Sequence, residues 1–280
     1  MPTAVLCKHK LLPQLTDILI RLTAKLYGIK LARLTSKTGY SLVELIVVII
    51  ILGIITSVAL RALRSTSETV KTEQTKKELD QLAWAIAGQP DLVSGGQRTD
   101  YGYIGDVGSM PSNLDALVSN PGYSTWDGSY IRDEFYPQDT SSETEFKVDA
   151  WGTVYSYSGG NTITSTGGGT TITRQIANSL DDLLRNTVSA IVTDLDNTPP
   201  GSVYKDSIKF LLTYPNGSGS TVTSTRYPGS DGFVQFDSIP IGSHLLRAVY
   251  IPNNDTLTRK VGMEPGQNWY STVNLYEDVW

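Results

Sequence analysis

The sequence predicts an α+β protein with a long N-terminal helix whose first half is transmembrane, a small α+β head, and an all-β antiparallel sandwich. Three patterns predict this class. Residues 40–60 are apolar apart from one charge, Glu44. Beyond a polar gap, Leu79, Leu82 and Ile86 recur three and four positions apart, which is the spacing of one helix face. Residues 187–280 contain seven short alternating runs separated by Pro and Gly.

The apolar stretch at residues 40–60 has the length of a membrane span. Its 21 residues would extend about 31 Å as a helix, close to the thickness of a bilayer core. It is too long for an ordinary signal peptide, and no A-x-A cleavage site follows it. Dense β-branched residues on every face favour a membrane span over a buried core helix. We therefore expect a transmembrane segment at about residues 40–60.

The same helix is expected to continue beyond the membrane. Leu79, Leu82 and Ile86 share one face, and the pattern ends at Gly88 and Pro90. We predict one helix from Tyr40 to Ala87, about 70 Å long, within a segment assigned to residues 40–88. Its second half is amphipathic and therefore needs a domain to cover its apolar stripe.

Charge is distributed unevenly along the chain. Residues 1–39 carry seven Lys and Arg against one Asp, whereas the remainder carries 16 basic and 27 acidic residues. Because basic residues mark the cytoplasmic flank of a span, we expect the N-terminus in the cytoplasm and the globular part across the membrane. An acidic body also argues against nucleic-acid binding.

Residues that usually carry enzyme chemistry are scarce. The only cysteine, Cys7, and one of two histidines, His9, precede the span, which leaves His244 alone in the body. No Cys/His metal set, nucleophile–base pair or paired-carboxylate motif can be assembled from these residues. We predict that the protein is not an enzyme, with no cofactor and no metal site.

The middle region, residues 89–177, is expected to form a small head. A short helix is predicted at 112–119, where Leu114, Leu117 and Val118 share a face. Strands are predicted at 153–157, 161–165 and 170–174, the last two forming a hairpin around the GGG at 167–169. Residues 178–186 are expected to be a linker.

The third region, residues 187–280, is expected to be the sandwich. Regular strand spacing with intervening turns is typical of this architecture. The predicted strands are 187–194, 207–213, 221–227, 233–236, 244–250, 257–263 and 269–275.

The segment KTGYSLVELIVVIIILGII, which begins at Lys37, resembles the class III signal of type IV pilins and type II secretion pseudopilins. The resemblance implies cleavage of leader residues 1–39 after Gly39 by a prepilin peptidase, followed by N-methylation of Tyr40. It also implies that Glu44 pairs with the α-amino group of a neighbouring subunit, because an unpaired carboxylate in lipid is costly. Gly53 would be the position at which the packed helix melts locally, because Gly has a low helix propensity. The leader is long, and Arg61 stands where many relatives have proline.

Three further segments resemble, in order, the G-type major pseudopilin: MPSNLDALVSNP (110–121), WDGSYI (126–131) and DAWGTVYSY (149–157). Ala150 and Val154 replace two prolines of that pattern. In those relatives, acidic residues after the third segment bind calcium. Residues 158–175 contain no Asp or Glu here, so no calcium site is transferred.

The last region resembles the carboxypeptidase regulatory-like and collagen-adhesin B-type sandwich modules, through TDLDNTPPG (193–201) and DGFVQFDSIPIG (231–242). Such modules are spacers or adhesive domains. Asp194 and Asp196 are interpreted as a turn rather than a calcium ligand pair. His244 is interpreted as a core residue.

The resemblances imply a filament subunit of either a type II secretion pseudopilus or a type IV pilus, serving protein secretion or surface attachment. Its expected partners are copies of itself or other pilins, the prepilin peptidase and an inner-membrane assembly platform. Its expected place is the bacterial inner membrane, single-pass with periplasmic domains, and then a periplasmic or surface filament. One alternative is a membrane-anchored adhesive or glycan-binding protein that uses the sandwich. The other, a membrane-anchored enzyme, is disfavoured by the residue content.

Overall fold

The computed structural model describes residues 41–131 and 145–280. The expected leader, with Gly39 and Tyr40, lies outside these residues. The chain divides into two compact units, residues 1–61 and 62–280. We call residues 89–131 and 145–185 the head, and residues 186–280 the sandwich.

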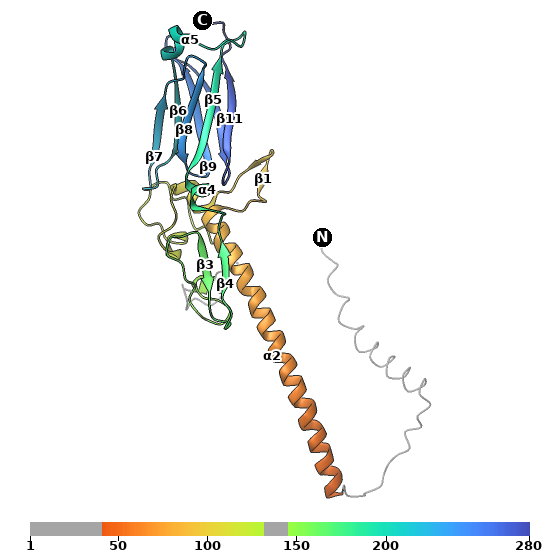
Figure 1. Cartoon of the computed structure of the whole chain (residues 1–280). Coiled ribbons are helices and arrows are strands. Elements are labelled where there is room, and N and C mark those ends of the chain that lie inside the picture. Colours follow the sequence, from red (N-terminus) through yellow and green to blue (C-terminus); the bar gives the residue numbers. More distant parts are fainter. Residues whose placement is uncertain (1–40, 132–144) are drawn as a thin grey trace, which may run out of the picture. The chain divides into compact units, whose positions relative to one another are not determined.

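One long helix, α2 (Leu42–Ala87), confirms the predicted continuous helix over its described length (Figure 1). It ends where Gly88 adopts a left-handed φ of 79° and its N–H donates to the carbonyl of Trp84. A Cβ at Gly88 would lie 2.2 Å from the backbone oxygen of Asp100, so this close approach requires glycine. Arg61 lies inside the helix, where no proline interrupts the hydrogen-bond ladder.

The two halves of α2 differ in exposure. In the first unit, the apolar side chains from Leu42 to Leu60 are exposed, and by length and composition α2 could cross a membrane. In the second unit, Thr75, Leu79 and Ile86 are buried on one face. The predicted amphipathic second half is therefore confirmed.

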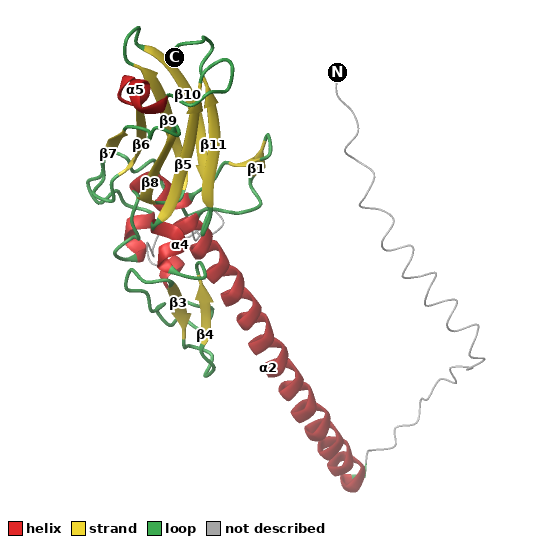
Figure 2. Cartoon of the chain, turned by 45° about the horizontal axis from the view of Figure 1, so that its top comes forward, coloured by secondary structure: helices red, strands yellow, loops and turns green. Residues whose placement is uncertain are grey.

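The head consists of short elements around loops. Its strands pair in two hairpins, and short helical turns lie between them (Figure 2). In chain order these elements are β1 (Val93–Ser94), β2 (Gln97–Arg98), α3 (Gly102–Val107), η1 (Leu114–Leu117), η3 (Glu145–Lys147), β3 (Thr162–Ser165) and β4 (Ile172–Gln175).

Two local predictions in the head need correction, and one is confirmed. The helix expected at 112–119 is a single 3₁₀ turn, η1, capped by the side chain of Asn113. The strand expected at 153–157 forms only isolated bridges, Val154 with Val148 and Ser156 with Thr164. The turn from Asp149 to Thr153, held by a bond from the N–H of Thr153 to the Asp149 carboxylate, joins Val148 to its partner Val154. The hairpin of β3 and β4 is antiparallel as predicted.

The linker expected at 178–186 is wrong. The helix α4 (Leu180–Leu184) occupies this segment and begins with a capping box, in which Ser179 and Asp182 each bind the backbone N–H of the other. Leu183 is completely buried. A capped helix with a buried anchor fixes the segment, whereas the polar run of Asn, Ser and Asp indicated a loop.

The sandwich contains two sheets with strand orders β10-β9-β6-β7 and β11-β5-β8. A short helix, α5 (Gly201–Tyr204), and a 3₁₀ turn, η4 (Lys205–Ser207), lie between its first two strands. All seven predicted strands are present: β5 (Asn186–Thr193), β6 (Ile208–Pro215), β7 (Thr221–Arg226), β8 (Phe233–Ile239), β9 (Gly242–Tyr250), β10 (Asp255–Met263) and β11 (Asn268–Asn274).

The prediction that the sandwich is wholly antiparallel is wrong at one pair. β11 pairs parallel with β5, from Asn268 opposite Thr187 to Asn274 opposite Thr193. A strand alternates apolar and polar residues in the same way in either orientation, so the sequence pattern carries no information on direction.

Two hydrophobic cores form within the second unit. One gathers the end of α2 and the head, and the other fills the space between the two sheets. Ile241 is an exception, because it lies in the β8–β9 corner of the sandwich but is buried in the head core. Its N–H donates to the carbonyl of Leu183, 2.9 Å away. Gly217 N–H similarly donates to the carbonyl of Val107, so backbone bonds join the head and sandwich.

Candidate functional site: the N-terminal helix and its head

The expected processing residues Gly39 and Tyr40 lie outside the described residues. Glu44 lies in the first turn of α2 and is the only acidic residue there. Its side chain is exposed and makes no hydrogen bond or ion pair within the described part of the chain. Gly53 lies within the helix, and a Cβ built there would meet no atom within 4 Å. The helix therefore presents a lone carboxylate on an apolar, uncovered surface.

The second half of α2 is attached to the head by polar contacts as well as by its apolar face. Trp151 Nε1 donates to Glu68 Oε2 at 2.8 Å. Tyr155 donates its hydroxyl proton to Glu78 Oε2 at 2.6 Å, and the two atoms come from residues 77 positions apart. Arg174 Nε lies 2.7 Å from Asp80 Oδ1. These contacts extend along α2 and fix the head against it.

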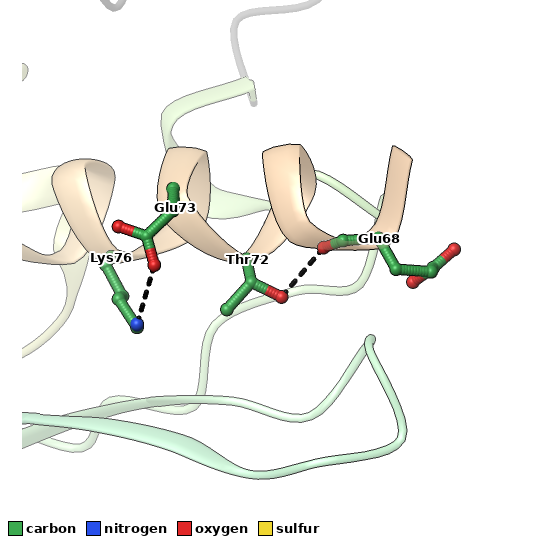
Figure 3. Close-up of polar contacts among 4 residues, drawn as sticks. All are labelled: Glu68, Thr72, Glu73 and Lys76. Atoms are coloured by element: carbon green, nitrogen blue, oxygen red, sulfur yellow. Dashed lines mark hydrogen bonds and ion pairs between the residues drawn. The ribbon is translucent and has the colours of Figure 1, made fainter. Parts of the chain in front are cut away.

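Other polar groups of α2 bond only within the helix. Thr72 Oγ1 donates to the backbone oxygen of Glu68, and Lys76 pairs with Glu73 at 2.7 Å (Figure 3). The Lys76–Glu73 pair is exposed, and it lowers the pKa of Glu73 through its hydrogen bond. Glu73 therefore provides an exposed control position on the same helix, and its ion pair lies within that helix.

Replacing Tyr155 with Phe tests the attachment of the head. Tyr155 is buried, and burial together with the bond to Glu78 raises the pKa of its hydroxyl, which stays protonated as a donor. We expect Tyr155→Phe to lower the free energy of unfolding by about 1.5 kcal/mol, because a buried bond to a charged acceptor is lost. Chemical denaturation of the full chain in detergent measures the change. Tyr270→Phe, at an exposed position, should leave stability unchanged.

Asp149 is a buried carboxylate that organises the head. Its Oδ1 accepts the N–H groups of Trp151 and Thr153, and its Oδ2 accepts Ser165 Oγ at 2.6 Å and the N–H of Gly167 at 3.0 Å. Burial raises the pKa of Asp149, but these four bonds, that from Ser165 first, outweigh it and hold the pKa below its usual value. The carboxylate thus fixes the turn after it and the β3–β4 turn.

The sequence contains a local pattern that points to the role of Asp149. Asp149 is the first residue of DAWGTVYSY, and an Asp followed two residues later by Trp-Gly is typical of a side chain that caps its own turn. Its bonds to Ser165 and Gly167 depend on long-range folding, and no local pattern predicts them.

An acidic cleft lies beside α3. Its volume is about 270 Å³, and none of its lining residues is basic. Tyr130 donates its hydroxyl proton to Asp106 at 2.8 Å. Burial raises the pKa of Asp106, and the charges of Asp127 and Asp100 add to this effect. The cleft can attract positive charge, but its carboxylates do not form a compact ligand set.

The turn containing Asp194 and Asp196 brings together a possible cation site. Asp194 is buried, the Thr198 hydroxyl shares its one proton between the two carboxylate oxygens, and the Thr198 N–H donates to Oδ1, which is the turn role expected. Asp278, which the sequence reasoning missed, places its carboxylate beside them, and ligand atoms of the three lie within 4.8 Å of one another. The bonds from Thr198 close the turn that follows Asp194.

Comparisons with known proteins add little. No family model matches the sequence, and no curated protein matches it. Among solved structures, a dioxygenase domain from Streptomyces sp. SirexAA-E matches 35% of this chain and 82% of its own, with 15% identity and a TM-score of 0.25. The major pilin subunit BcpA of Bacillus cereus matches 42% of this chain and 37% of its own, with 14% identity and a TM-score of 0.23. At these TM-scores neither likeness carries an argument about this chain.

Proposed function

We propose that the protein is a prepilin-type filament subunit. The observation that carries the proposal is the first half of α2, which has exposed apolar side chains throughout and one carboxylate, Glu44, in its first turn. Such a surface must be covered by lipid before assembly and by neighbouring helices after it. Burial of apolar helix surface against neighbours offsets the cost of leaving the bilayer.

The sequence supports the same role at the residues that precede the helix. A prepilin peptidase cleaves after Gly39 in the cytoplasm and methylates Tyr40, and the globular part lies in the periplasm. An inner-membrane platform then assembles the subunits into a pseudopilus or a type IV pilus. The role is assembly rather than catalysis. The segment KTGYSLVEL supports cleavage, and the basic residues before it support the orientation.

Replacing Glu44 with Gln tests the proposal. Gln keeps the size of the side chain but removes the charge that would pair with a neighbour's amino group. Loss of this charge pair between subunits costs about 2.5 kcal/mol, which weakens each subunit–subunit equilibrium roughly 60-fold. We expect normal membrane insertion and cleavage but a loss of filaments, measured by shearing filaments from cells and comparing sheared with total protein.

The matched control is Glu73→Gln, which makes the same change at an exposed position of the same helix (Figure 3). It should leave filament yield unchanged. Normal filament yield from Glu44→Gln would overturn the role of Glu44. A wild-type chain that forms no filament in cells with active assembly machinery would overturn the proposed function.

A further inference from the structure

His244 lies where the sandwich meets the head. It belongs to β9, is 3% exposed, and packs its ring edge against Tyr214 with ring centroids 6.2 Å apart. A Cβ on Gly242 would lie 2.9 Å from His244 Cε1 and 3.2 Å from the backbone oxygen of Gly105 in α3. The ring, the corner at Gly242 and α3 are therefore packed closely together.

The hydrogen bonding of His244 is one-sided. Nε2 lies 2.7 Å from the carbonyl oxygen of Pro240. Because a carbonyl can only accept, Nε2 carries the proton of a neutral ring. Nδ1 is buried and has no partner among the described residues. A second proton on Nδ1 would therefore place an unpaired charge in the packed junction.

The corner that His244 contacts carries Ile241, whose side chain lies in the head core. Pro240 and Gly242 flank Ile241, whose side chain is completely buried among head residues. The N–H of Ile241 donates to the carbonyl of Leu183 in α4. Movement of the Pro240–Gly242 corner would break this bond and withdraw Ile241 from the core.

We propose that His244 is a proton-sensitive contact that holds the sandwich to the head. Protonation of its ring displaces the Pro240–Gly242 corner and releases Ile241 from the head core. This device is separate from the filament role and does not depend on it.

The direction of the pH dependence follows from the burial of the ring. Burial lowers the pKa of His244 below 6.5, and the Pro240 carbonyl opposes this only in part. The unfolded or released state therefore binds the proton more tightly than the packed state. The contribution of His244 is fully present above pH 6.5 and is lost as the pH falls from 6.5 toward the lower folded pKa.

Other titratable groups on the elements around His244 must be separated from it. Tyr214 faces the ring, and burial raises the pKa of Tyr103 to about 12, so the Tyr103 hydroxyl stays protonated in this range. Asp106 in α3 needs a control, because burial raises its pKa above the ordinary value of a carboxyl group. Strands β9 and β10 also carry three basic side chains, Arg247, Arg259 and Lys260.

Hydrogen exchange of the full chain in detergent tests the proposal, with rates corrected for the intrinsic effect of pH. In the wild type, we expect protection of the peptide containing Ile241 to fall several-fold as the pH is lowered from about 7.5 to about 5.0. Strands β5 and β6, in the sandwich core, should keep their protection.

The variant His244→Gln supplies the matched control, because its neutral amide can still donate to Pro240. We expect no pH-dependent loss of protection in this variant, and an undiminished loss in Asp106→Asn. Unchanged protection in the wild type, the same loss in His244→Gln, or disappearance of the loss in Asp106→Asn would each overturn the proposal. If His244→Gln does not fold, the imidazole NMR titration of wild-type His244 decides. The loss of protection at Ile241 must have the same pH midpoint as the His244 titration, and a different midpoint overturns the proposal.

Discussion

Asp149→Ala should cause a large loss of stability in the head. The four donors that bind the carboxylate would lose their acceptor, and the buried Ser165 hydroxyl would be left unsatisfied. We expect the free energy of unfolding to fall by about 3 kcal/mol or more, because each orphaned donor adds a desolvation cost. Urea denaturation of the full chain in detergent measures this loss.

The control for Asp149 is an aspartate with no such network. Asp181 is exposed and forms only an ion pair with Arg185 one turn away. Exposed pairs of this kind contribute little, so Asp181→Ala should change stability by less than about 0.5 kcal/mol. Equal urea midpoints for Asp149→Ala and the wild type would contradict the role assigned to Asp149.

The pH dependence gives a second test of Asp149. Its pKa is lower in the folded chain than in the unfolded chain, so its contribution is fully present above the ordinary value of 3.8. That contribution is lost as the pH falls below 3.8 toward the folded pKa. The urea midpoint of the wild type should therefore fall more steeply below that pH than that of Asp149→Asn.

Ile241→Ala should destabilise the head although Ile241 lies in the sandwich. Ile241 is completely buried in the head core, so truncation leaves a cavity there. Large-to-small changes of this kind cost about 2–4 kcal/mol. We expect hydrogen exchange to accelerate at Ile86 and Leu117 in the head core, in step with the fall in the urea midpoint.

Val203→Ala is the matched control for the sandwich, because Val203 is 76% exposed. It should change stability by less than about 0.5 kcal/mol. If Ile241→Ala accelerated exchange only in the sandwich strands, the attachment of the two parts through this corner would be contradicted. The same attachment implies that deleting residues 187–280 would also remove a piece of the head core.

The sequence predicts those helices and strands in which apolar residues recur at a regular spacing. The alternation of Val188, Ala190 and Val192 with polar residues marks β5, and all three are buried as the pattern implies. The continuous helix was predictable because its apolar and amphipathic halves meet without an interruption. A short helix with only one buried side chain, Leu183 in α4, has no apolar periodicity, so its polar sequence predicts a linker instead.

Contacts between distant residues were not predictable in the same way. The parallel pairing of β11 with β5 depends on how the sandwich closes. The alternation of apolar and polar residues along a strand does not reveal the direction of its partner. Asp149 depends on the fold to bring Ser165 near, and Ile241 depends on the docking of a corner against α4. The processing residues Gly39 and Tyr40 remain predictions from the sequence, as does the pairing of Glu44.

The mature N-terminus of the chain tests most directly whether it is a prepilin-type subunit. Intact mass and N-terminal sequencing of protein from membranes, with and without the prepilin peptidase, measure it. We predict a chain beginning at Tyr40 with one added methyl group when the peptidase is active, and an uncleaved chain when it is absent. A chain that still begins upstream of Gly39 in cells with active peptidase would contradict the account.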